Sequence, residues 1–112
     1  MIATFVQKGD AIDYTPVADV AAGAVIVVGD LVGVAKQAIL ADKLGSLSLV
    51  GVFEVPKLIG DGLEITVGSV CYWDATNQEA TESNGGGANK RMGHCARYAG
   101  DTEETVRVRF SQ

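Results

Sequence analysis

Cysteine and histidine are the residue types best suited to metal binding or nucleophilic catalysis, and the chain holds three of them: Cys71, His94 and Cys95. Thiolate and imidazole are the usual ligands of zinc, and Asp74 follows Cys71 closely enough to add a fourth. The spacing argues against such a site. The CxxC pairs of structural zinc sites are missing, and neighbouring strand residues such as His94 and Cys95 point to opposite faces of a sheet. We therefore expect no metal site.

A cysteine nucleophile would need a general base within hydrogen-bond reach, and His94 is the one histidine that could serve Cys71. The sequence contains no recognisable oxyanion hole and no third residue that would orient the histidine. Carboxylate pairs such as Glu103 and Glu104 are more typical of solvated turns than of acid–base catalysis. We expect no enzyme and no cofactor, and a small cysteine hydrolase that uses Cys71 and His94 remains an alternative.

The longest polar stretch, residues 81–90, contains the run Gly85-Gly86-Gly87. A phosphate-binding P-loop requires GxxxxGK[ST] between a strand and a helix, whereas Lys90 follows Asn89 and precedes Arg91. The stretch does not fit nucleotide binding. Its composition instead predicts a mobile surface loop.

Composition excludes several classes of partner. A net charge of −5 disfavours nucleic acid, because affinity for phosphate backbones comes mainly from lysine and arginine. The nearest approach to a basic cluster is interleaved with Glu103 and Glu104 and is typical of a mixed solvated surface; it comprises Lys90, Arg91, Arg97, Arg107 and Arg109. No apolar run approaches the ~18 residues that span a bilayer, and the first residues do not form a signal peptide. We expect a soluble, unsecreted protein with reduced cysteines that binds neither nucleic acid nor membrane.

Glycines that separate short β-branched runs predict an all-β fold, and 112 residues fit one domain, 1–112, folded as a small barrel or sandwich. The continuous apolar run 25–28 predicts a strand buried on both faces. In 105–110 the alternation predicts that Val106, Val108 and Phe110 point inward and the two arginines outward. We expect strands at 2–7, 11–15, 25–28, 31–35, 46–54, 64–67, 69–73, 91–99 and 105–110.

Two further patterns concern organisation. Residues 36–43 hold good helix formers but are short and lack a clear cap, so a helix there is an alternative to irregular structure. Residues 23–31 and 62–70 match each other at a constant offset, each with glycine at its first and seventh positions. The match suggests two related β-units around one core.

Taken in order, these segments resemble the short phage proteins of the capsid cement, or head decoration, family. Each segment is weakly specific alone, but their order and spacing together are distinctive. The resemblance is carried by 5–9 (FVQKG), 12–15 (IDYT), 23–25 (GAV), 29–35 (GDLVGVA), 51–57 (GVFEVPK), 68–74 (GSVCYWD) and 106–109 (VRVR). Cys71 is a small departure from the family pattern.

The resemblance implies a β-rich protein without an active site that binds the outer surface of a phage head, commonly as a trimer, and reinforces it. The implied partner is the major capsid protein, and the implied location is the virion surface, reached from the host cytoplasm. Another virion protein or a head–tail adaptor is the alternative.

The terminal segment 1–7 is a candidate attachment arm, because a terminal strand can leave its own sheet and add to the edge of another. The expected partner-binding residues on this arm are Ile2, Thr4, Phe5 and Gln7.

Overall fold

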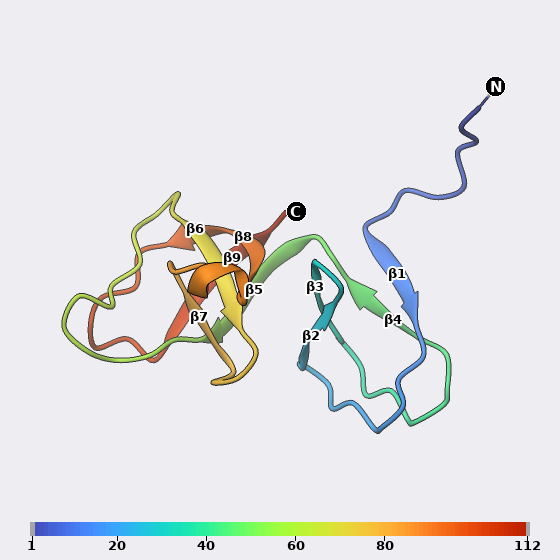
Figure 1. Cartoon of the computed structure of the whole chain (residues 1–112), viewed down its shortest axis with the longest axis horizontal. Helices are drawn as coiled ribbons and strands as arrows, with labels where there is room; N and C mark the ends of the chain where they lie inside the picture. The colour runs from blue at the N-terminus through green and yellow to red at the C-terminus, as the bar shows by residue number, and fades with distance from the viewer. Residues whose placement is uncertain (1, 112) are drawn as a thin grey trace.

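The computed structural model describes residues 2–111 and confirms the all-β prediction, as a sandwich-like pair of antiparallel sheets rather than a closed barrel (Figure 1). A single short 3-10 turn, η1 (Gly85–Gly87), is the helical structure of this part of the chain, and no helix in it has the length and apolar character to cross a membrane. The strands are β1 (Ala11–Tyr14), β2 (Val25–Val28), β3 (Leu31–Val34), β4 (Gly45–Ser48), β5 (Gly51–Pro56), β6 (Val70–Asp74), β7 (Glu79–Thr81), β8 (Lys90–Arg97) and β9 (Thr105–Phe110).

The four N-terminal strands form one sheet in the order β1-β4-β3-β2, and the others form a second sheet in the order β5-β9-β8-β6-β7. The chain passes from the first sheet to the second between β4 and β5 (Figure 1). The single strand expected at 46–54 is therefore wrong. The extended pairing is interrupted at Leu49 and Val50, and Gly51 has a φ of 136° that a side chain would disfavour.

The main hydrophobic core contains residues from both sheets. In β9, Val106, Val108 and Phe110 are buried while the arginines between them are exposed, which confirms the predicted alternation. Phe53 packs its ring edge-to-face against Phe110 with the ring centroids 5.3 Å apart. The buried members of this core are Val32, Val34, Val55, Ile65, Cys71, Trp73, Ala80, Met92, Cys95, Ala99, Val106, Val108 and Phe110.

A smaller core, made of the buried residues Ala35, Ile39 and Leu47, has Ile12, Tyr14, Val20 and Ile26 packed against it. The segment between β3 and β4 runs over this core without forming the helix considered for 36–43. Ile39 instead makes a bridge with Val20, and its amide donates to the Val20 carbonyl oxygen at 2.9 Å. The bridge satisfies backbone groups that a short uncapped helix would have left unpaired.

Strand β2 lies at the edge of the four-stranded sheet, so the expectation that Val25–Val28 is buried on both faces is wrong. Its first three residues are half-buried and Val28 is exposed. A run of four valine and isoleucine residues fits a central strand equally well, and the sequence pattern does not distinguish the two positions. The turn after β2 is tied to the other sheet by the Lys90 ammonium, 2.9 Å from an Asp30 carboxylate oxygen.

The two glycine-bounded segments share backbone conformations but not strand pairing. Gly23 and Gly62 both have positive φ, as do Gly29 and Gly68. The first segment folds into the β2–β3 hairpin, whereas in the second Ile65 forms an isolated bridge with Ala99 and regular pairing begins at Val70, the first residue of β6. The strand expected at 64–67 is thus reduced to a single bridge.

The polar stretch 81–90 folds around η1. The Asn84 side chain accepts a hydrogen bond from the Gly86 amide at 3.1 Å, and the Asn89 side-chain amide donates to the Ser83 carbonyl oxygen at 3.0 Å. The mobility of this loop and the single-domain organisation both remain predictions.

Candidate partner-binding surfaces

The N-terminal segment preceding β1 extends away from both sheets as an arm (Figure 1). All of residues 2–10 are exposed, and none of them belongs to a strand, so the strand expected at Ile2 to Gln7 is wrong. The alternation of apolar and polar residues suits a strand, but no neighbouring strand of the same chain pairs with it. We define residues 2–7 as the arm; Met1 lies outside the described residues.

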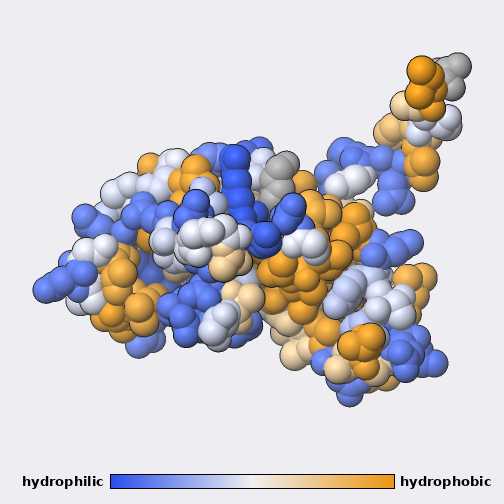
Figure 2. Space-filling model, viewed as in Figure 1, coloured by the Kyte–Doolittle hydropathy of each residue, from blue (hydrophilic) through white to orange (hydrophobic). Residues whose placement is uncertain are grey.

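The four expected partner-binding residues lie together on this arm. Ile2 is fully exposed and Phe5 retains 84% of its accessible surface, and the outer end of the arm is apolar in Figure 2. The Gln7 side chain stays local and donates to the Ala11 carbonyl oxygen at 3.4 Å. Just after the arm, the chain is held by the Leu49 amide, which donates to the Asp10 carbonyl oxygen at 2.9 Å. The arm thus presents apolar side chains from a fixed base.

The two cysteines are buried free thiols in the larger core. Burial raises the pKa of the Cys71 thiol to about 12, and the Cys95 thiol also has a raised pKa because of burial. The Cys95 thiol donates to the Arg97 carbonyl oxygen at 3.0 Å. Since the thiolate is the nucleophilic form, neither thiol is activated at neutral pH.

The pairing of β6 with β8 separates Cys71 from His94. Residue Val70 is the partner of His94, and Cys71, one residue later on β6, points into the core while His94 lies on the outer face. The dyad of the hydrolase alternative is therefore not formed. Within residues 2–111, no three histidine, cysteine or acidic side chains gather where they could hold a metal ion.

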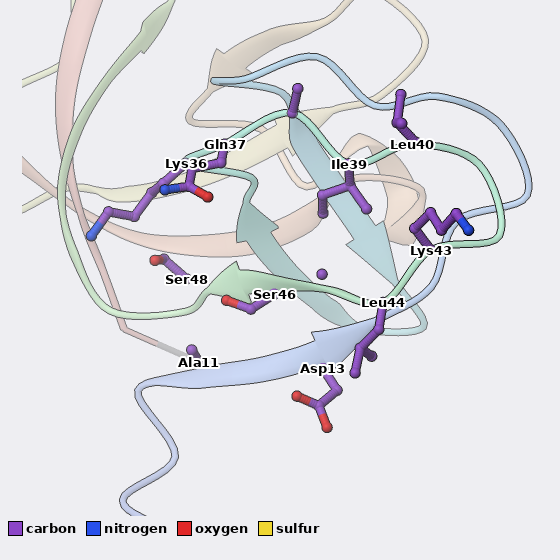
Figure 3. A pocket seen from close by; sticks show the side chains of 12 residues that line it. Ala11, Asp13, Lys36, Gln37, Ile39, Leu40, Lys43, Leu44, Ser46 and Ser48 are labelled. Atoms are coloured by element: carbon purple, nitrogen blue, oxygen red, sulfur yellow. The ribbon is translucent and has the colours of Figure 1, made fainter.

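An open groove of about 830 Å³ lies beside the four-stranded sheet (Figure 3). Asp13, Ser46 and Ser48 line it from β1 and β4, and the segment with Lys36 and Lys43 lines the other side. Among the lining residues Asp13 is the sole carboxylate, and none is a histidine or cysteine. The groove therefore offers no nucleophile–base pair.

The outer face of the five-stranded sheet carries the four arginines that the sequence analysis grouped with Lys90 and interpreted as a mixed solvated surface. All four arginines of the chain are exposed and lie on this face. In the sheet, Arg109 is paired with His94, and Arg107 with Arg97. The alternation in β9 correctly placed two arginines outward, but nothing in the sequence placed the other two beside them. We call Arg91, Arg97, Arg107 and Arg109 the arginine face.

Comparison with known proteins yields one match. A family model described as phage cement protein matches residues 6–110. No curated protein and no solved structure matches the chain. The match spans both sheets and the arginine face, and it begins within the arm, after Ile2, Thr4 and Phe5.

Proposed function

Since this chain belongs to the phage cement protein family, we propose that it binds the outer surface of an assembled phage head and stabilises the shell. The observation that carries this proposal is the family match over nearly the whole chain. The partner is then the major capsid protein, and the protein works on the virion surface after folding in the host cytoplasm. Function by binding rather than by catalysis agrees with the two buried thiols, whose pKa values are raised.

Self-association into a trimer is the second part of the proposal. It is supported by the amount of apolar surface that the chain leaves exposed. Figure 2 shows apolar surface over the β2–β3 hairpin in addition to the arm, and β2 is a sheet edge with unpaired backbone groups. Sedimentation equilibrium of the purified protein tests this part: a mass of one chain at all concentrations contradicts it.

The decisive test of the cement role is to mix the protein with purified heads that lack it. We expect it to sediment with the heads and to raise the temperature at which they release DNA. A protein that ignores heads but sediments with isolated portal or tail complexes would instead support the adaptor alternative.

The arm is proposed as the main attachment element. Deletion of residues 2–7 removes no strand and no buried side chain, so we expect a folded protein that no longer decorates heads. Circular dichroism measures the fold and co-sedimentation measures the binding. Decoration at the wild-type level by the truncated protein would refute this role.

Single substitutions sharpen the same test. Phe5→Ser removes one exposed apolar side chain from the arm, and we expect it to weaken decoration. Val17→Ser is the matched control, because Val17 is 94% exposed and lies away from the arm. An equal loss of decoration in both variants would show that general surface polarity, not the arm, determines binding.

A further inference from the structure

We propose that the arginine face binds a protein surface rich in aspartate and glutamate, and that this surface belongs to the outside of the capsid shell. The second half of this inference rests on the proposed function. The arginine face lies on β8 and β9, which are neighbours in the middle of the five-stranded sheet. The arm and the arginine face then form two separate attachment surfaces.

Two β-bulges in β8 bring the arginines to one face. Arg91, His94 and Arg97 are spaced three residues apart, and in a regular strand that spacing would place His94 opposite the other two. The pairing of β6 with β8 shifts register between Cys71 and Tyr72. The pairing of β8 with β9 shifts register between Cys95 and Arg97. Each bulge adds one residue to β8, which restores the outward direction at the next position.

Within residues 2–111 the four guanidinium groups have no ion-pair partner, because the ion pairs of this part of the chain are Lys8 with Asp10 and Lys90 with Asp30. Carboxylates are present on the same face without forming an ion pair with an arginine: Glu54, the cross-strand partner of Arg107, accepts a hydrogen bond from the Thr105 hydroxyl at 3.1 Å, and Asp74 and Glu79 are paired with each other in β6 and β7. Four exposed arginines therefore keep their donors free. Arginine binds carboxylates in a bidentate manner, so a partner surface with aspartate and glutamate would satisfy them.

Other residues on the face favour a protein partner over nucleic acid. Val52, 57% exposed, is paired with Arg109, and the half-buried Tyr72 is paired with Arg91. Arginine and tyrosine with apolar neighbours are typical of the centres of protein interfaces. The carboxylate of Glu54 and the net charge of −5 oppose the approach of a polyanion, whose binding depends on long-range attraction.

The test compares two double variants with the same change in charge. Arg107→Gln with Arg109→Gln alters the arginine face, and Lys36→Gln with Lys43→Gln alters exposed lysines beside the four-stranded sheet. We expect the arginine variant to bind undecorated heads about 10- to 100-fold more weakly than the wild type. The lysine variant should bind as the wild type does. Circular dichroism establishes that both variants are folded.

A third variant, Arg109→Lys, provides a direct readout of carboxylate contact. Carbodiimide couples an amine to a carboxylate that touches it, so treatment of decorated heads should join position 109 to an aspartate or glutamate of the shell. Mass spectrometry of the peptides identifies that residue. Duplex DNA is tested in parallel as a competing partner.

The outcomes separate this inference from the proposed function. If the wild-type protein binds heads, the arginine variant binds them equally well and no cross-link forms from position 109, the proposed role of the arginine face is wrong. The cement role stands in that case. Wild-type protein that binds no heads overturns the cement role and the shell partner together. Binding to duplex DNA that is lost in the arginine variant overturns the choice of a protein partner.

Discussion

The two sheets are held together in different ways. In the five-stranded sheet, β5 and β9 pair along their whole length, and one face covers most of the larger core. In the four-stranded sheet, β3 and β4 meet at a single pair, Val34 with Ser48, so the sheet consists of two strand pairs with a narrow join. The smaller core, which packs against this sheet, contains three buried residues.

This difference predicts that the five-stranded sheet is the more stable of the two and the four-stranded sheet the more easily deformed. The sheet with the longer strand pairings and the larger core is expected to hold its outer face more rigidly, which suits arginines that must keep a fixed spacing. The sheet with a narrow join and a small core is expected to open locally at lower free energy. The arm is attached to the four-stranded sheet, next to β1, where local movement would help it to reach a partner.

The largest expected effect comes from glycine substitutions that compare the sheets directly. A Cβ at Gly93 would overlap the backbone carbonyl of Arg109, and a strand in the middle of a sheet cannot move away. We expect Gly93→Ala to lower the free energy of unfolding by roughly 4–5 kcal/mol or to prevent folding.

A Cβ at Gly45 would lie 2.6–2.8 Å from Cδ1, Cγ1 and Cγ2 of Ile39, so that side chain would have to shift within the smaller core, whereas no backbone atom is in the way. Gly45→Ala should cost about 1–3 kcal/mol. Urea unfolding followed by circular dichroism measures both variants. Equal losses in the two variants would contradict the difference that we draw between the sheets.

Core truncations should show the same order with smaller values. Phe110→Ala removes a fully buried ring from the larger core and should cost about 3–5 kcal/mol, whereas Leu47→Ala in the smaller core should cost about 2–3 kcal/mol. Amide hydrogen exchange locates the damage. With Leu47→Ala we expect faster exchange in β1 and β4 and unchanged protection in β8 and β9. Faster exchange throughout the chain would mean that the sheets unfold as one unit.

Alkaline pH should affect the five-stranded sheet first, because both cysteines lie in it. The Cys71 pKa is raised by burial to about 12, above the usual value near 9, so the thiol is bound to its proton more tightly in the folded state. Its contribution is fully present below pH 9 and is lost as the pH rises toward 12. The loss should be on the order of 1 kcal/mol by pH 10.

Trp73, the one tryptophan of the chain, reports on this core by its fluorescence during urea unfolding at pH 8 and pH 10. Cys71→Ala should be less stable than the wild type at pH 8 but should lose less stability between the two pH values. A pH dependence identical in both proteins would show that Cys71 does not titrate above its usual range.

Local sequence patterns correctly predicted the strands whose position in the sheet agrees with the pattern. The alternation in 105–110 identified β9 and its buried face. The errors fall where the outcome depends on a distant strand. Ile2 to Gln7 lacks a partner, Val25–Val28 lies at an edge, and 46–54 divides between sheets.

Composition, strand periodicity and ordered short motifs are local properties of the chain, so they were enough to establish the all-β class, the family and the absence of a P-loop. The tertiary structure alone decided which residues share a surface. It removed Cys71 from the reach of His94, freed the arm from the sheets and brought four arginines onto one face. The physical reason is that strand register and β-bulges are set by pairing between segments far apart in the sequence, and one inserted residue reverses the direction of every side chain that follows.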